Sequence, residues 1–386
     1  MLVRFVYFQH FFYFSSSFHL FSCLWLLDYI YGIFFRTYRL ESVEFTPIVD
    51  NTGTQMLWRN PEGFNVKSGE YVQIKLPWLI RGSEWHPFSV YLREATQEGL
   101  SEVYCNDFGD SWTGSMSSTS LNEIALIELG KGDSESVQHF IRRVVDSGFG
   151  NFREDRPDVV NQGPDCHSRI RVERDHIKQY STTQVFISPV GDWSKELFDQ
   201  VKSTKHLRSC SCWVRGPYTS PYFIAHNFNH LVLTASGIGI TPALGVMGQY
   251  QGNTRTKVLI WSTRSKTLLK FFAPLLKDAH LSIVYYTNKN DVLTKREMSK
   301  IQCYGNIFIE QSRPESLTVI IEYIIMTFEN GMRSTTKSIR DLMRVDATHR
   351  AAWCVLYCGG SVQIRDQLTQ FTKDKGIGWE CELFNW

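Results

Sequence analysis

Short runs of alternating apolar and polar residues characterise the chain after residue 40. The segments at 42–46 and 71–76 alternate in this way, and turns rich in glycine and proline separate them. A period of two directs one side of each segment to a core and the other to water, which is typical of antiparallel strands. The pattern therefore predicts a small antiparallel β-barrel.

In the C-terminal part the pattern changes to wholly apolar runs separated by segments with helical periodicity. The apolar runs lie at 258–263, 281–287 and 351–358, and the helical segments lie at 268–279 and 361–374. Strands that are apolar on both faces and alternate with helices are typical of a parallel sheet covered on both sides. We therefore expect α+β and α/β parts, with the barrel followed by a doubly wound parallel sheet.

The segment at 94–183 shows neither period. It contains a serine-rich stretch at 115–120 and a stretch of mixed acids, arginines, glycines and prolines at 146–175. Such compositions bury too little apolar surface to offset the entropy of folding. We interpret the segment as a long, partly unstructured insertion with one helical piece near 136–145. Deletion of residues 115–175 is expected to leave the chemistry largely intact.

The run at 5–27 is mostly apolar and carries no charge until its end, so it is long enough to cross a bilayer as a helix. Arg36 and Arg39 follow it, which favours a cytosolic C-terminal side. A cleaved signal peptide is the alternative, because Arg4 precedes the run. No small-residue cleavage site is evident, however, and the run exceeds a typical signal core. We therefore expect an N-terminal transmembrane helix at 5–27.

The composition of the chain excludes some classes of function. The chain has 386 residues, 43% of them hydrophobic and 21% charged, which is typical of a folded protein with two or three domains. The formal net charge of +2 gives no indication of a nucleic-acid partner. The nine cysteines form no C-x-x-C pair, so no zinc or iron–sulfur site is expected.

A glycine-rich loop follows the apolar strand near residue 232. It reads Gly237-Ile238-Gly239-Ile240-Thr241-Pro242, where a dinucleotide loop of the G-x-G-x-x-G type would have a third glycine. Proline suits the first turn of a helix because no helical hydrogen-bond donor is lost there. The loop therefore has the shape of a nucleotide loop that leads into a helix, without the usual third glycine.

Three further segments have the residue types of ligand-binding turns. In residues 84–90, His86 and Ser89 offer side chains that reach polar ligand atoms. In residues 191–197 a strand ends at Gly191 and a helix begins, with Ser194 well placed as its N-cap and free backbone amides for a pyrophosphate. Residues 215–221 are rich in turn formers. Taken singly, residues 84–90 are a weak signal, residues 191–197 are better explained as an ordinary capped helix, and residues 215–221 as a domain hinge.

In their order along the chain, the motifs HPFS, GDWS, GPYTSP, GIGITP and CGG, with an aromatic C-terminus, resemble one superfamily. It is the ferredoxin–NADP reductase fold in its membrane-linked branch, the ferric-chelate reductases and NADPH oxidases. The resemblance covers about residues 20–93, 184–314 and 351–386. It implies an FAD-binding domain at 41–222 that carries the insertion, and an NADPH-binding domain at 223–386.

The same resemblance implies the activity and the cofactor contacts. NADPH would pass hydride to FAD, which would release single electrons to a small-molecule acceptor, either a ferric chelate or dioxygen reached through haem. The implied contacts are His86, Pro87, Phe88 and Ser89 for FAD; Gly191, Trp193 and Ser194 for its pyrophosphate; Gly237, Gly239, Thr241 and Pro242 for the NADPH pyrophosphate; Arg264 and Arg313 for the 2′-phosphate; and Cys358, Gly359 and Gly360 for the nicotinamide. A C-terminal aromatic, Phe384 or Trp386, would cover the flavin.

Several residues depart from the family pattern. Thr219 stands where glycine is usual, and Ser188 and Pro189 stand where basic residues for the flavin phosphates are common. A second turn at 108–113 imitates GDWS, but only GDWS leads directly into a helix and then into GPYTSP. Arg93 is a candidate replacement for the absent basic residues.

The family's haem ligands are also not recognised. His10 and His19 are too close in sequence for a haem pair and are interpreted as packing or lipid-interface residues. We expect a haem-bearing membrane partner or a missing N-terminal segment, in a single- or multi-pass membrane protein with cytosolic FAD and NADPH domains. The alternative function is a truncated, non-catalytic, membrane-anchored module that binds nucleotide or partners.

Overall fold

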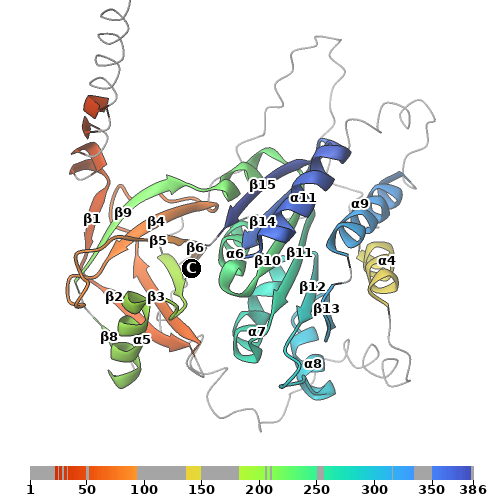
Figure 1. The fold of residues 1–386 in the computed structure, drawn as a ribbon, viewed down its shortest axis with the longest axis horizontal. Helices are drawn as coiled ribbons and strands as arrows, with labels where there is room; N and C mark the ends of the chain where they lie inside the picture. The colour runs from red at the N-terminus through yellow and green to blue at the C-terminus, as the bar shows by residue number, and fades with distance from the viewer. Residues whose placement is uncertain are drawn as a thin grey trace, which may run out of the picture.

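The computed structural model describes residues 22–24, 26–27, 30–32, 34–48, 52–93, 136–148, 182–204, 207–208, 211–249, 256–314, 316–333 and 350–383. Within these ranges the chain forms two antiparallel sheets, one parallel sheet and flanking helices (Figure 1). The antiparallel barrel and the covered parallel sheet predicted from the periodicities are thereby confirmed. Most of the predicted transmembrane helix lies outside the described residues, and no helix within them is long and apolar enough to span a membrane.

The barrel consists of two antiparallel sheets around one core. The first sheet has the order β1-β9-β4-β5, with β1 (Thr37–Leu40), β9 (Cys212–Thr219), β4 (Glu70–Lys75) and β5 (His86–Ser89). The second has the order β6-β7-β3-β2-β8, with β6 (Tyr91–Arg93), β7 (Thr182–Ile187), β3 (Gly53–Arg59), β2 (Val43–Ile48) and β8 (Leu207–Arg208).

Alternation decides which side of β4 faces that core. Val72 and Ile74 are fully buried, whereas Tyr71, Gln73 and Lys75 between and beside them are only partly buried. The helix α5 (Asp192–Thr204) covers one end of the barrel and adds its apolar stripe to the same core. Figure 1 shows α5 beside β2 and β3, away from the parallel sheet.

The second unit is a six-stranded parallel sheet. Its order is β13-β12-β11-β10-β14-β15, with β13 (Ile307–Glu310), β12 (Leu281–Tyr286), β11 (Thr256–Thr263), β10 (His230–Ser236), β14 (Trp353–Gly359) and β15 (Gly378–Leu383). The chain begins at β10 in the interior, builds outward to β13, and then returns to the other side of β10 for β14. The strand order therefore reverses between β10 and β14.

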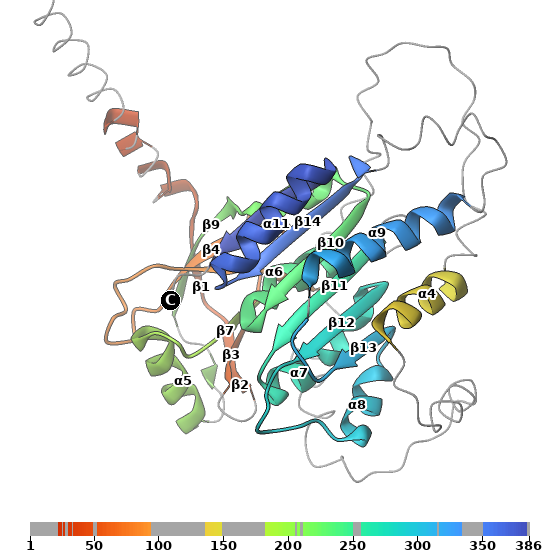
Figure 2. The same cartoon turned by 45° about the vertical axis from the view of Figure 1, so that its right-hand side comes forward.

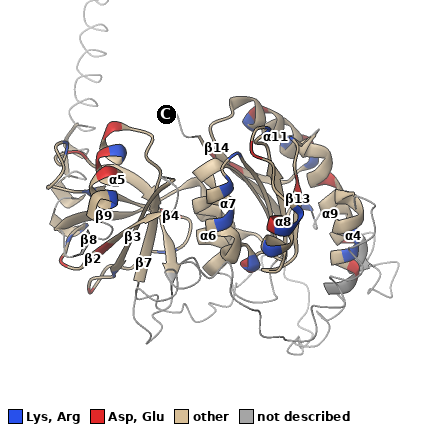
Figure 3. Cartoon of the chain, turned by 90° about the horizontal axis from the view of Figure 1, so that it is seen from below, with Lys and Arg blue, Asp and Glu red and all other residues tan. Residues whose placement is uncertain are grey.

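Helices cover both faces of this sheet. One face packs against α6 (Ile240–Gln249), α7 (Lys266–Phe272), α8 (Lys295–Gln302) and the 3₁₀ helices η3 (Pro221–Asn227) and η5 (Ala273–Asp278). The other packs against α4 (Val137–Gly148), α9 (Leu317–Arg333) and α11 (Val362–Lys375). Figure 3 shows the charged residues concentrated on helices such as α5, α7, α8 and α11, while the sheets carry few.

The insertion supplies a structural helix to the second unit. The chain leaves the barrel at β6, and α4 then lies against α9 and the strand β12 of the parallel sheet (Figure 2). Phe140, Ile141 and Val144 of α4 are at most 5% exposed and belong to the core of that face. The helix predicted near 136–145 is confirmed. The outcome expected for a deletion of residues 115–175 stays a prediction, and such a deletion would remove α4 and uncover this core.

The two units meet along a closely packed seam. Helix α6 of the second unit lies on β6 of the barrel, and glycines make the approach possible. A Cβ atom at Gly245 would lie 2.5 Å from the carbonyl oxygen of Val90, and one at Gly248 would lie 3.2 Å from the ring of Tyr91. Phe186 of β7 also enters the core of the second unit. The seam therefore fixes residues 89–91 of the barrel against α6.

Candidate functional site

The carboxyl ends of β10 and β14 form the reversal point of the parallel sheet, which is where open α/β sheets bind ligands. The GIGITP loop leaves β10 here through the short 3₁₀ helix η4 (Gly237–Gly239) and enters α6. Cys358 and Gly359 end β14 beside it, and Ser361 then caps α11. Two of the sequence-predicted motifs, more than a hundred residues apart, are thus neighbours.

Contact between the two loops leaves no room for larger residues. A Cβ at Gly239 would lie 2.6 Å from the carbonyl oxygen and 3.3 Å from the sulfur of Cys358. Burial raises the pKa of the Cys358 thiol well above its usual range, so the thiol is neutral at physiological pH. Cys358 is fully buried, and its compact, neutral thiol packs under the GIGITP loop.

In the GIGITP loop, backbone atoms are placed for a ligand, whereas side chains pack into the core. Gly237 has φ +55°, a conformation that favours glycine, and nothing lies within 4 Å of its Cβ position. Its carbonyl oxygen accepts a hydrogen bond of 2.9 Å from the indole N–H of Trp261. The side chains of Thr241 and Pro242 are buried. The backbone of this loop, in particular at its first residues, is therefore the part that is placed to contact a phosphate.

The C-terminal end of α6 is held as firmly as its start. The ammonium group of Lys257, which is 3% exposed, donates a 2.8 Å hydrogen bond to the carbonyl oxygen of Met247. Burial lowers the pKa of Lys257 to about 8. The side chain of Gln249 accepts a 3.0 Å hydrogen bond from the backbone amide of Ser68 in the barrel. Helix α6 thus keeps a fixed position between the loops and the barrel.

The HPFS motif forms β5, the edge strand of the first barrel sheet. Pairing with β4 places Ser89 opposite Tyr71 and Phe88 opposite the buried Val72. Ser89 therefore faces outward with Pro87, whereas His86 and Phe88 face inward. The inward rings lie on Trp193, with ring centroids 4.3 Å from His86 and 5.9 Å from Phe88. The four residues of the motif therefore do not all face one side of the strand: Pro87 and Ser89 face outward, whereas His86 and Phe88 face into the barrel.

The GDWS motif begins α5 beside that strand. The helix starts at Asp192, two residues before the expected N-cap, because Ser194 hydrogen-bonds back to the amide and carbonyl of Gly191 at 3.1 and 3.0 Å. Trp193 is 3% exposed, and its indole N–H has no hydrogen-bond partner among the described residues. Its side chain belongs to the barrel core, so only its backbone remains for an anion.

A positive group stands at the start of α5. Arg81 lies in the loop before β5 and approaches the carboxylate of Asp192 at 3.2 Å, with both side chains more than half exposed. Basic residues were noted as absent at positions 188 and 189. Arg81 is the arginine that the fold brings to this helix start, and sequence spacing gave no reason to select it. The side chain of Arg93 lies outside what the structure describes.

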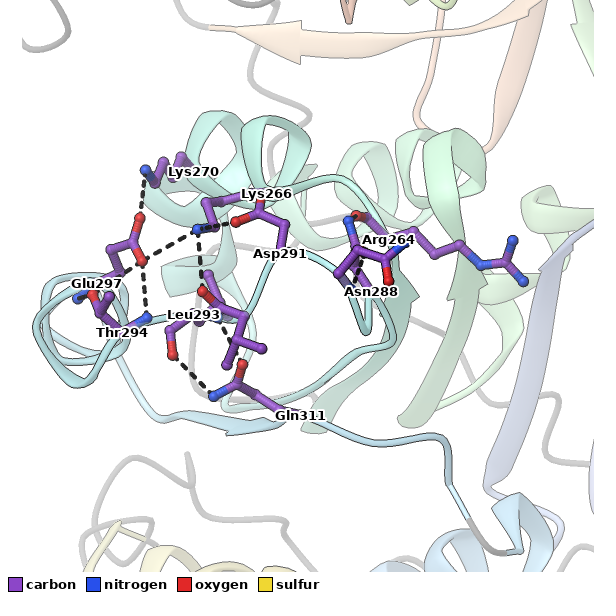
Figure 4. Close-up of polar contacts among 11 residues, drawn as sticks. Arg264, Lys266, Lys270, Asn288, Asp291, Leu293, Thr294, Glu297 and Gln311 are labelled. Atoms are coloured by element: carbon purple, nitrogen blue, oxygen red, sulfur yellow. Dashed lines mark hydrogen bonds and ion pairs between the residues drawn. The ribbon is translucent and has the colours of Figure 1, made fainter.

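The segments that follow β11 and β12, including α7 and the start of α8, are joined by polar contacts beside the reversal point. Figure 4 shows Lys266 between Asp291 and Glu297, at distances of 2.6 and 3.4 Å, with Lys270 also on Glu297 at 2.9 Å. Burial acts to raise the pKa of Glu297, but hydrogen bonds from Thr294 and Lys270 outweigh it and lower the pKa to about 2. The carboxylate therefore stays charged and holds these loops together.

Arg264 projects out of these joined segments. Its backbone carbonyl accepts a 3.1 Å hydrogen bond from Asn288, while its exposed guanidinium points away from the acidic residues (Figure 4). It follows β11 by one residue, and β11 pairs directly with β10 through Ser262 and Ser236. An exposed cation thus lies next to the loop at the reversal point.

Arg313 occupies a more distant position. It follows β13, the outermost strand, which lies three strand spacings from β10, or roughly 14 Å. Of the two predicted arginines, the fold therefore brings Arg264 next to the loop and leaves Arg313 at the edge of the sheet. Phe384, Trp386 and the alternative turn at 108–113 lie outside the described residues. The last described residue, Leu383, pairs with Gly359.

The residues at the reversal point, and those around β5 and the start of α5, fit the groups that the sequence resemblance implies. At the reversal point, glycine backbone and a neutral thiol surround the start of α6, as a dinucleotide pyrophosphate and an apolar ring edge would require. At β5, an outward Ser89 lies on the same sheet face as Tyr71 and Tyr218, whose rings stack at 5.3 Å. The α5 start with Arg81 adds amides and one cation. The residues fit the implied group better at the GIGITP loop than at the GDWS motif, because the carboxylate of Asp192 also lies at the start of α5.

Comparison with known proteins gives similarities of fold only. No family model matches the chain, and no curated protein sequence matches it. It is similar to a ferredoxin NADP+ reductase from Neisseria gonorrhoeae with bound FAD and NADP (10% identity, TM-score 0.44, 90% of this chain and 98% of that chain). It is also similar to a flavohemoglobin from Malassezia yamatoensis with bound FAD and heme (13% identity, TM-score 0.42, 91% and 60%).

A third similar structure is the full-length CYP116B46 from Tepidiphilus thermophilus, at 10% identity and TM-score 0.42, with 91% of this chain and 29% of that chain covered. The chain thus spans less than two thirds of some of these proteins. FAD and NADP, the cofactors predicted from the sequence, are among the groups named for the structures it is similar to.

Three positions that shape the site were not selected from the sequence. Gly245 and Gly248 set the seam between the units, and Tyr357 touches both loops of the reversal point. A pair of glycines three residues apart in an apolar helix is a usable signal for close packing. No sequence signal distinguishes Tyr357 from any other aromatic residue in a buried strand.

Proposed function

We propose that this chain is a flavin-dependent NAD(P)H oxidoreductase. The observation that carries the proposal is the convergence of three motifs on one seam. Gly239, the residue before α6, touches Cys358, and Gly245 of α6 touches Val90, the residue after Ser89. The two glycines are six positions apart in the sequence, about 9 Å along a helix axis. A nicotinamide at Cys358 and a flavin at Ser89 would therefore be close neighbours.

The chain's own contribution would be to bind and orient. The backbone at Gly237 and Gly239, with the start of α6, would hold the dinucleotide pyrophosphate, and Arg264 would attract its 2′-phosphate. Ser89 and the outward face of β4 and β9 would support the flavin, with Arg81 near its phosphates. FAD, when bound, supplies the conversion between a two-electron donor and one-electron acceptors. Burial of Cys358 would exclude water beside the nicotinamide.

Within that class, we propose the ferric reductase or NADPH oxidase type, held at a membrane with its cofactor domains on the cytosolic side. Two observations support this. The motif order HPFS, GDWS, GPYTSP, GIGITP and CGG resembles that type, and the helical residues before β1 expose large apolar side chains. Leu24 is 54% exposed, Leu27 61%, Phe34 74% and Phe35 67%, values unusual in water. A haem-bearing partner or further segment would then carry electrons to ferric chelate or dioxygen.

The full chain, purified in detergent and supplied with FAD, is the material for a first test. We expect a yellow protein that oxidises NADPH when ferricyanide is the acceptor, followed at the absorbance of NADPH. A folded protein that retains no flavin and oxidises no NADPH would contradict the proposal and favour the non-catalytic binding module. Flavin without NADPH oxidation would contradict the assignment of the dinucleotide loop.

Arg264→Ala tests the choice between NADPH and NADH. Loss of one charge-assisted contact, about 1.5–3 kcal/mol, should raise the KM for NADPH roughly 10- to 100-fold and leave that for NADH nearly unchanged. Steady-state kinetics with both dinucleotides measures this. Arg313→Ala, at the far edge of the sheet, and Lys277→Ala, an exposed cation of the same unit, should keep the wild-type preference. An unaltered NADPH preference in Arg264→Ala would remove Arg264 from the phosphate site.

A further inference from the structure

Tyr357 lies beneath both loops of the reversal point. It belongs to β14, two residues before its end, and is 1% exposed. Pairing with β10 places it level with Thr234, and its hydroxyl reaches the backbone of Ser361, two residues past the end of β14. Its hydroxyl accepts a 3.1 Å hydrogen bond from the backbone amide of Ser361, the N-cap of α11. The side-chain hydroxyl of Ser236, the last residue of β10, lies nearby, because both oxygens surround the position that a Cβ atom at Gly359 would take.

These contacts explain why position 359 has no side chain. A Cβ atom at Gly359 would collide with the Ser236 hydroxyl and would lie 2.7 Å from the Tyr357 hydroxyl. The glycine therefore leaves room for the bridge between the loops, in addition to any ligand above it. The bridge joins the residue that opens the GIGITP loop to the residue that opens α11.

Proton positions follow from the donors and acceptors present. Burial raises the pKa of Tyr357, and the hydrogen bond from the Ser361 amide offsets this only in part, so the phenol keeps its proton. Because its oxygen accepts from the Ser361 amide, the phenol proton is available to Ser236 Oγ. The Ser236 proton is then free to be donated to a ligand acceptor at the start of the GIGITP loop.

We propose that the Tyr357 hydroxyl is a positioning group for dinucleotide binding, which bridges Ser236 to the Ser361 amide and thereby fixes the GIGITP loop relative to the start of α11. This inference rests on the proposed function, since it names how that site is held open and aimed. Ser236, oriented by the bridge, supplies a hydroxyl donor to the pyrophosphate or the adjoining ribose of the dinucleotide. Tyr357 acts through Ser236 and the two loops and makes no contact of its own with the ligand.

Another tyrosine of the same sheet provides a matched comparison. Tyr285 lies on β12, packs on the same face and is 1% exposed, but its hydroxyl has no hydrogen-bond partner among the described residues. Replacement of Tyr285 by phenylalanine removes a buried hydroxyl and breaks no such bond. A role of Tyr357 in packing alone predicts that the two Tyr→Phe variants behave alike.

The test uses the full chain with Tyr357→Phe, Tyr285→Phe and Ser236→Ala. Two quantities are measured: hydrogen exchange of residues 359–364 without dinucleotide, and KM and kcat for NADPH oxidation. We expect Tyr357→Phe to speed exchange in that segment and to raise KM about five- to tenfold, the worth of one neutral hydrogen bond, with kcat within twofold. Ser236→Ala should raise KM similarly, and the double variant by less than the product of the two effects.

The outcomes separate this inference from the proposed function. Tyr357→Phe matching Tyr285→Phe in both exchange and KM would overturn the bridge, as would fully multiplicative effects of the Tyr357 and Ser236 variants. A wild-type protein that oxidises no NADPH would reject the proposed function, and faster exchange in Tyr357→Phe would then still support the bridge. If Tyr357→Phe does not fold, Ser236→Ala breaks the same bridge from the loop side and decides the matter by the same two measurements.

Discussion

Gly239→Val should abolish NADPH oxidation while leaving FAD bound. The new Cβ would lie 2.6 Å from the carbonyl oxygen of Cys358, a backbone atom that no side-chain rotation can move. The loop at the reversal point and the end of β14 must therefore separate, and a displacement of about 1 Å in such a site lowers rates on the order of a hundredfold. We expect kcat/KM for NADPH to fall at least that far, measured by dinucleotide oxidation alongside flavin content.

The same substitution at Gly305 is the control. Gly305 belongs to the same unit, and the nearest atom to its Cβ position is 3.4 Å away, so Gly305→Val should retain activity. Equal loss of flavin and turnover in Gly239→Val, with the thermal unfolding midpoint unchanged, would show that the loop belongs to the flavin site instead. Full turnover would show that the loop holds no dinucleotide.

Ile141→Asp should strongly destabilise the second unit. Ile141 is fully buried between α4 and the parallel sheet, although it comes from the insertion in the barrel domain. Loss of its apolar contacts and burial of a carboxylate would cost about 3–5 kcal/mol, a large part of the stability of a domain. Urea unfolding, followed by tryptophan fluorescence, should show a lower midpoint, and the protein should expose apolar surface to a hydrophobic dye.

Arg142→Asp is the matched control, because residue 142 is the exposed neighbour of Ile141 on α4. Its effect should stay within about 0.5 kcal/mol, as for most surface substitutions. If both aspartate variants unfold at the wild-type urea concentration, α4 is not held on the sheet in solution. In that case the insertion would be dispensable, as the sequence pattern alone suggested.

The sequence alone was sufficient to predict the local secondary structure and to recognise the glycine-rich motifs. A period of two near 42–46 and 71–76 predicts barrel strands, and β2 and β4 lie there. Apolar runs alternating with helical segments predict the parallel sheet, because each strand of such a sheet is buried on both faces. The GIGITP loop and the CGG turn were recognisable because glycines are required where backbones approach closely.

Only the tertiary structure decided which faces meet. Periodicity shows that α4 has an apolar side but not that this side covers the parallel sheet, since the covering partner depends on a long-range chain path. The inward direction of His86 and the burial of Trp193 follow from the register of β5 and the placement of α5, which no local pattern specifies. The Tyr357 bridge likewise depends on β10 and β14 being neighbours at the point where strand order reverses. Contacts between distant segments arise from topology, whereas the sequence by itself determines local conformation and polarity.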